Sequence, residues 1–190
     1  MRRKHRNVRH TYYTSMHIII FIVLLGGTLL GSIVAGRLYI ESFNIVSQNI
    51  YESFRNISAY YDRAAGFRDG FFKYSRTIIL IWVLGFLYGG SFFQTIIIGL
   101  RGFFVGYSVS IFVIQFGAGG LLLAIPAILT QNIFLIIICL WISLKSSNIQ
   151  IEFSEKILLL TFSLAGAVII SLYETYISPP ICLLIFNALN

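Results

Sequence analysis

The sequence predicts an all-α fold: a polytopic integral membrane helical bundle of about five transmembrane helices, with a broken or re-entrant helix between the third and the fourth. First, the 114 residues that follow Arg76 carry only six charged side chains, whereas a water-soluble domain normally has about a quarter of its residues charged. Second, the uncharged runs 77–100, 102–144 and 157–173 are long enough to cross a bilayer, which takes roughly 20 apolar residues per helix. Third, 57% of the 190 residues are hydrophobic, so one compact bundle accounts for nearly the whole chain.

A basic segment, 1–16, precedes the first predicted span, 17–36. The segment contains five arginine or lysine residues and no acidic residue, which is typical of the cytoplasmic side of a first membrane helix. An apolar run of about 20 residues is longer than the apolar core of a signal peptide, which spans about 7–15 residues. We therefore interpret 17–36 as an uncleaved signal anchor.

The segment 37–76 is the only long polar stretch, with six basic and four acidic residues. Its apolar residues recur at intervals of three or four, which is the spacing of one face of a helix. These residues are Phe43, Val46, Ile50, Phe54, Ile57 and Tyr61. Gly66 and Gly70 are expected to break this helix before the second span. Two interpretations stay open: an amphipathic connector that lies on the membrane, or a docking surface for a partner.

The second predicted span lies within 77–100, and the run 102–144 holds the third and the fourth. Four residues of the 102–144 run are expected to break the helix: Gly117, Pro126, Gln131 and Asn132. The favoured arrangement is a short span at 102–116, a half-helix at about 119–129 that enters the membrane without crossing, and a return span at about 131–144. The non-helical backbone that this arrangement requires is tolerated at membrane depth where protein or water covers it. The alternative is two plain helices, the second of which contains the proline and both amides.

A short polar loop, 145–156, leads to the fifth predicted span at about 157–177. The sequence Ser178-Pro179-Pro180 is expected to stop that helix, because proline cannot continue the hydrogen-bond ladder and disfavours helix in the residue before it. The apolar C-terminal tail, 178–190, is too short to cross a membrane. It is predicted to lie in the interface or to pack into the bundle.

The distribution of basic residues predicts the orientation. With the N-terminus in the cytoplasm, eight basic residues fall on the cytoplasmic side, Arg101 and Lys145 among them, and six fall on the outer side. The cluster before the first span dominates this comparison, because five cationic residues resist translocation. The prediction is a multi-pass protein of the cell membrane with a cytoplasmic N-terminus, an extracytoplasmic 37–76 segment and an outer C-terminus.

Small residues recur at four-residue spacing within the predicted spans. The glycines in this pattern are Gly27, Gly31, Gly85, Gly89, Gly102 and Gly106. Such spacing lets helix backbones approach closely and gain dispersion contacts that lipid does not supply. We expect these glycines to pack helices within the bundle, and a homo-oligomer is the alternative.

The chain has little equipment for catalysis. Its three histidines all lie at or before the start of the first span, and its only aspartates, Asp62 and Asp69, lie in the polar segment. No metal-ligand or phosphate-binding motif occurs in the sequence. Cys139 and Cys182 are expected to be small buried hydrophobes at opposite ends of the bundle, without a disulfide. We therefore expect a protein that is not an enzyme, with no cofactor, metal or nucleic acid, and with membrane lipid around it.

Glu174 is the one acidic residue near the interior of a predicted membrane helix. An ionisable residue at membrane depth is costly and is a functional-site candidate by default. The structural alternative is that Glu174 lies near the outer interface and pairs with Arg37, Arg76 or a tyrosine.

Five sequence fragments stand in a characteristic order along the chain. They are Trp82-Val83-Leu84-Gly85, Arg101-Gly102-Phe103-Phe104-Val105-Gly106-Tyr107-Ser108-Val109, Gln115-Phe116-Gly117, Gln131-Asn132-Ile133 and Ser171-Leu172-Tyr173-Glu174-Thr175-Tyr176-Ile177-Ser178-Pro179. In order and spacing they resemble the stage II sporulation protein M family, from about Trp82 to Pro179. That family has a proline directly before its Gln-Asn pair, whereas here Thr130 occupies that place and the proline is Pro126.

The resemblance implies an endospore-forming bacterium and a role in engulfment, when the mother-cell membrane migrates around the forespore. In that family the protein is a membrane scaffold. It recruits two peptidoglycan-degrading partners, sporulation proteins D and P, whose catalytic domains lie outside the membrane. The first functional hypothesis is therefore a non-enzymatic scaffold for cell-wall hydrolases in the engulfing membrane.

The second hypothesis is a small membrane transporter or channel subunit. It draws on the polar residues Gln94, Gln115, Gln131 and Asn132 and on the predicted broken helix, because transporters build midplane sites from such elements. For the scaffold, the partner-binding candidates are the residues expected on the outer side. They are the six apolar residues between Phe43 and Tyr61, together with Glu174, Tyr176 and Pro179.

Overall fold

The computed structural model describes residues 18–38, 62–87, 89–146 and 152–189, and every regular element in these ranges is a helix. The prediction of an all-α fold is therefore confirmed. The first helix is Ile18–Leu38. The others are α2 (Arg63–Leu84), α3 (Gly90–Phe116), α4 (Ala118–Ala124), α5 (Thr130–Ser146), α6 (Phe153–Leu172) and α7 (Ser178–Leu189), with the π-helices η1 (Ile125–Leu129) between α4 and α5 and η2 (Tyr173–Ile177) between α6 and α7.

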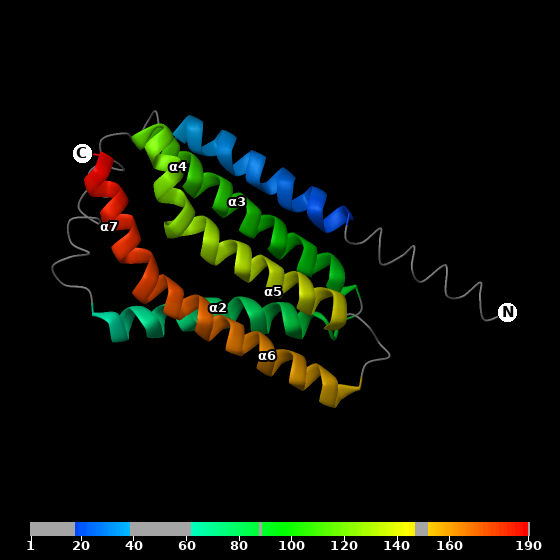
Figure 1. The fold of residues 1–190 in the computed structure, drawn as a ribbon. Coiled ribbons are helices and arrows are strands. Elements are labelled where there is room, and N and C mark those ends of the chain that lie inside the picture. Colours follow the sequence, from blue (N-terminus) through cyan, green and yellow to red (C-terminus); the bar gives the residue numbers. More distant parts are fainter. Residues whose placement is uncertain (1–17, 39–61, 88, 147–151, 190) are drawn as a thin grey trace.

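Successive helical runs cross the molecule in alternating directions, so that the first helix begins at the end opposite to the end of α7 (Figure 1). Four runs are long and apolar enough to cross a membrane: Ile18–Leu38, Gly90–Phe116, Ala118–Lys145 and Phe153–Ala188. Helix α2 is a fifth long helix of 22 residues, or roughly 33 Å at 1.5 Å per residue. The protein is thus a multi-pass membrane helical bundle.

The predicted boundaries of the second and third spans are wrong. The run 77–100 is not one helix, because the chain turns between α2 and α3, where Gly89 has a φ of 79°. Gly90 then packs so closely on the end of α2 that a Cβ there would overlap the carbonyl oxygen of Leu84. Gly85 and Gly89 therefore belong to a corner rather than to a helix face. Arg101 lies inside α3 rather than in a loop, which lowers the cytoplasmic count of basic residues by one.

The prediction that Gly66 and Gly70 break a helix is also wrong, because both lie inside α2. Asp62 is the N-cap of this helix, because its carboxylate accepts hydrogen bonds from the amides of Ala64 and Ala65 at 3.0 and 3.4 Å. Gly70 is buried, and a Cβ there would lie 2.9 Å from the hydroxyl oxygen of Ser171. The glycine is needed for close helix packing, and residues 63–76 belong to the bundle rather than to a connector.

The favoured half-helix at about 119–129 does not turn back. The chain turns at Gly117, which has a φ of 60°, and then continues as one run through α4, η1 and α5. Pro126 is accommodated by η1, since a π-helix tolerates a local change in the hydrogen-bond ladder. The alternative with the proline and both amides inside one helix is the observed one.

The predicted stop at Ser178-Pro179-Pro180 is likewise wrong, because η2 carries the chain straight into α7. The prolines lie within this continuous run, directly after η2, where a π-turn accommodates the local change in the hydrogen-bond ladder. The tail packs into the bundle, since α7 contacts α4 and η1. This is one of the two placements that the sequence predicted.

The main core lies among α2, α5 and α6, and the outer surface is apolar. The largest fully buried side chain in the main core is that of Tyr74. A smaller cluster at the α7 end contains Leu123 and Cys182. Cys139 belongs to the main core, so the two cysteines are buried and lie in separate clusters, both with free thiols. Large apolar side chains such as Leu184 (72%) and Phe92 (66%) are exposed, as expected where lipid is the solvent.

The first helix packs parallel to α3 through glycines on both helices. A Cβ on Gly31 would overlap the carbonyl oxygen of Phe103, and a Cβ on Gly106 would overlap that of Thr28. A Cβ on Gly102 would lie 2.6 Å from the carbonyl oxygen of Leu24. A Cβ on Gly27 would likewise overlap the carbonyl oxygen of Gly99. These glycines let two membrane helices touch backbone to backbone.

Candidate functional site

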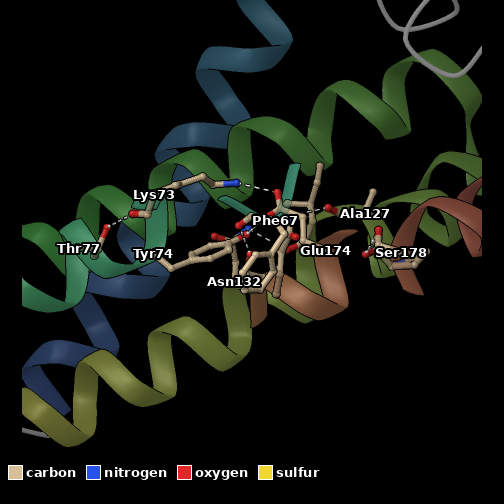
Figure 2. A network of polar contacts seen from close by, with 12 residues as sticks. Phe67, Lys73, Tyr74, Thr77, Ala127, Asn132, Glu174 and Ser178 are labelled. Atoms are coloured by element: carbon tan, nitrogen blue, oxygen red, sulfur yellow. Dashed lines mark hydrogen bonds and ion pairs between the residues drawn. The ribbon is translucent and has the colours of Figure 1, made fainter. Parts of the chain in front are cut away.

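Glu174 joins η2 to α2 through both of its carboxylate oxygens. Lys73 Nζ lies 2.8 Å from Oε1, and the hydroxyl of Tyr74 donates to Oε2 at 2.6 Å (Figure 2). The side chain of Glu174 is 26% exposed and that of Lys73 is 49% exposed, whereas Tyr74 is fully buried. A tyrosine is among the partners predicted for Glu174; the cation is Lys73 rather than Arg37 or Arg76.

Arg101 extends this polar cluster to α3. Its Nη2 donates to the hydroxyl of Thr77, and that hydroxyl donates to the carbonyl oxygen of Lys73 at 3.4 Å. Arg101 comes eleven residues after Gly90, which begins α3, so it lies roughly 17 Å along the helix. That is about half of a hydrocarbon core of roughly 30 Å. Ionisable groups at such depth are costly unless they are paired, and this network supplies the partners.

A second group of polar contacts surrounds η1. Four consecutive carbonyl oxygens, those of residues 125–128, each accept a hydrogen bond from a side chain. The donors are Thr130 (2.9 Å to Ile125), Ser178 (2.9 Å to Pro126), Gln131 (2.6 Å to Ala127) and Asn132 (2.8 Å to Ile128). Tyr173 adds a longer contact of 3.4 Å to Pro126. These side chains give the carbonyl oxygens of the π-helix hydrogen bonds in a region where water is scarce.

Through Pro126, the contacts of Tyr173 and Ser178 place one fragment of the family resemblance beside the helical run that carries another. Gln131 and Asn132 come from one fragment, and Tyr173, Glu174 and Ser178 come from the other. The structure joins them through η1 and η2, and Glu174 ties the pair to α2. Gln131 and Asn132 were predicted as part of a helix break, but they lie in α5 and donate to its preceding turn.

Gln94, another residue of the transporter hypothesis, is fully buried at the opposite end of α2. Its amide nitrogen donates to the carbonyl oxygen of Ile81 at 2.7 Å, and its oxygen accepts from the hydroxyl of Ser143 at 2.8 Å. It therefore ties α3 to α2 and α5. Gln115 lies one residue before the end of α3 and is half-buried.

The partner-binding candidates divide into two groups. Phe43, Val46, Ile50, Phe54, Ile57 and Tyr61 lie outside the described residues. Tyr176 is exposed, with the guanidinium of Arg63 5.7 Å from its ring centroid, and Pro179 is half-buried. Tyr176 therefore lies beside the first residue of α2.

Sequence reasoning missed Lys73, Tyr74, Thr77 and Ser143. The first three share a signal that was available: they stand at helical spacing, and Lys73 and Tyr74 lie just before the uncharged run that begins at Thr77. The interpretation of residues 63–76 as part of a connector obscured this helical spacing. The pairing with Glu174, about 100 residues later, has no local signal in the sequence.

Among the described residues, no group of three or more histidine, cysteine, aspartate or glutamate side chains is placed to hold a metal ion. No family model matches the chain, and no curated protein or solved structure matches it either.

Proposed function

We propose that the protein is a non-enzymatic membrane scaffold that holds partners at the end of the bundle where α2 begins. The observation that carries this proposal is the structural use of the polar side chains around η1 and η2. Tyr173 and Ser178 bind the carbonyl oxygen of Pro126, Gln131 and Asn132 bind the preceding turn of their own run, and Glu174 binds α2. Their polar groups bind backbone carbonyls and neighbouring side chains of the same chain. Such use of polar residues supports a rigid frame rather than a reaction centre.

At a finer level, the proposal assigns the chain to the stage II sporulation protein M family. The partners are then the peptidoglycan-degrading sporulation proteins D and P, recruited to the mother-cell membrane during engulfment. The resemblance between Trp82 and Pro179 supports this assignment. The helical spacing of the Phe43–Tyr61 face supports a docking role, because an apolar stripe flanked by charge suits helix or loop binding.

A transporter or channel subunit is the second candidate. The observation in its favour is the charged network of Arg101, Lys73 and Glu174 at the depth of the membrane, because such residues often mark ion or proton pathways. A cysteine substitution at Asn132, in a protein without Cys139 and Cys182, discriminates between the two functions. A water-filled route would expose this position to a hydrophilic thiol reagent, whereas a scaffold would leave it protected.

The scaffold is tested by affinity purification from sporulating cells. The tagged protein is expected to retain both cell-wall hydrolases, and Phe54→Ala combined with Ile57→Ala is expected to lose most of them at an unchanged level in the membrane. Truncation of an apolar anchor in an interface typically costs more than about 1 kcal/mol.

The matched control is Leu29→Ala combined with Leu30→Ala, which removes two apolar side chains that are 65% and 59% exposed on the first helix. This control is expected to retain both hydrolases. Full copurification with the Phe54/Ile57 variant would remove that face from the binding site. Absence of any hydrolase from the wild-type sample would overturn the scaffold.

A further inference from the structure

A groove lies between the end of α5 and the beginning of α6, far from the Glu174 network. Its volume is about 550 Å³, within the range of small-molecule sites. The described residues that line it are Trp141, Lys145, Glu155, Leu158, Leu159 and Phe162. On α6 they stand at intervals of three and four, so they form one face of that helix; on α5 the two contributors are four residues apart.

The groove is apolar along its length and charged at one end. Phe162 (62%) and Leu158 (58%) are open to the surroundings, so the wall can be reached sideways from the hydrocarbon of a bilayer. Lys145 is in the last turn of α5, and Glu155 is in the first turn of α6. Both belong to the end at which these two helices meet their connecting loop, which is the level of the lipid headgroups in a membrane-spanning pair.

The two charged groups of the groove are of opposite sign and free of ion pairs with other described side chains. Both are exposed. Lys145 Nζ lies 5.5 Å from the ring centroid of Trp141, a cation–π contact that places the ammonium beside an aromatic ring typical of the interface. The rim thus offers an ammonium for an anion and, from the facing helix, a carboxylate for a cation.

We propose that this groove binds a phospholipid with a primary ammonium in its headgroup, of the phosphatidylethanolamine type. Lys145 receives the phosphate, Glu155 receives the ammonium, and an acyl chain lies along Leu158 and Phe162. Charge complementarity selects this lipid. A phosphatidylglycerol headgroup offers Glu155 only neutral hydroxyl groups and no cation. A phosphatidylcholine headgroup carries a methylated nitrogen with no N–H to donate to the carboxylate.

The test uses the full chain, purified in a mild detergent, and native mass spectrometry with phosphatidylethanolamine, phosphatidylglycerol and phosphatidylcholine of the same acyl composition. The wild-type protein is expected to retain the ethanolamine lipid roughly threefold to tenfold better than the other two, as one charge-assisted contact allows. Glu155→Gln is expected to abolish this preference while leaving binding through Lys145. Lys145→Gln is expected to weaken all three lipids alike.

Glu152→Gln is the matched control, because Glu152 immediately precedes the same helix as its cap but does not line the groove. It is expected to behave as the wild type. Equal retention of the three lipids by the wild-type protein would overturn the proposal, and so would a preference that survives in Glu155→Gln or disappears in Glu152→Gln. The result is independent of whether cell-wall hydrolases copurify.

Discussion

Two charged side chains inside this bundle, Glu174 and Arg101, are stabilised by hydrogen-bonding partners from other helices. Glu174 uses both carboxylate oxygens, and Arg101 is bound to Thr77. In a membrane the alternative to such a contact is an ionised group in hydrocarbon, which costs several kcal/mol. The contacts are therefore a condition for placing these residues at mid-depth, and their removal leaves the opposite charge without compensation.

Replacing Glu174 by glutamine is expected to lower the free energy of unfolding by about 1–2 kcal/mol. The change removes the ion pair with Lys73 and weakens the hydrogen bond from Tyr74, and partial exposure of the lysine moderates the effect. Denaturant or thermal unfolding in detergent measures it. The control is Asp69→Asn on α2, the helix of Lys73, because the side chain of Asp69 is 76% exposed. It is expected to change stability by less than about 0.5 kcal/mol.

A second substitution, Lys73→Met, tests whether the effect of Glu174→Gln comes from the ion pair between the two residues. In the double variant the lysine no longer needs a counter-ion, so the two losses are expected to be non-additive. Additive losses would show that the ion pair does not contribute to stability.

Among the contacts that join the elements of this protein, two kinds depend on features of the backbone. The first is close backbone packing between the first helix and α3, which depends on glycine. The second is hydrogen bonding at the π-helices, where Ser178 of α7 donates to the carbonyl oxygen of Pro126 in η1. Both replace the hydrophobic effect, which does not drive helix association within lipid.

The glycine contact predicts a specific crosslink. Ser32 and Ser110 lie with their hydroxyl oxygens 2.7 Å apart, so cysteines at these positions are expected to form a disulfide under mild oxidation. Adding Gly31→Leu is expected to abolish most of this crosslink, because the new side chain would overlap the backbone of Phe103. Gly26→Leu is the control, since a Cβ there meets nothing within 4 Å. Equal crosslinking in both leucine variants would contradict the packing.

The π-helix contact predicts that Ser178→Ala lowers stability by about 0.5–1.5 kcal/mol. The variant leaves a buried carbonyl oxygen with one hydrogen bond fewer, and the range follows measured values for membrane helices. Thr161→Ala is the matched control, because its hydroxyl is exposed and binds only the preceding turn of its own helix at 3.1 Å. If the two alanine variants unfolded at the same temperature, the junction of η1 and α7 would have no special role.

At the scale of the whole molecule, the alternation of helical runs puts the start of the first helix and the end of α7 on opposite sides (Figure 1). The beginning of α2 and the end of α7 share one side, and the α5–α6 groove belongs to the other. The scaffold proposal places partners on the first side, and the lipid proposal uses the second.

Cysteine labelling tests the orientation. In a protein without Cys139 and Cys182, Ala64→Cys is expected to react with an impermeant reagent in intact cells, because Ala64 is exposed at the beginning of α2. Ser154→Cys, exposed at the beginning of α6, is expected to react only after permeabilisation. The reverse pattern would invert the predicted topology and place the proposed docking end in the cytoplasm.

The sequence by itself determined that lipid surrounds this protein and that its fold is a bundle of membrane helices. Six charges in its last 114 residues and long apolar runs require a helical membrane bundle, because only lipid solvates such a surface and helices satisfy their own backbone. It also indicated that Gly31 and Gly106 serve close packing.

Only the tertiary structure decided the boundaries of the helices and the partners of their polar residues. Gly70 and Pro179 read locally as breaks, yet both lie within continuous helical runs, because a neighbouring helix or a π-turn accommodates them. The pairing of Glu174 with Lys73 joins residues 101 positions apart. Local patterns follow the chain, whereas the cost of a charge in lipid is met by whichever partner the packing of distant helices brings near.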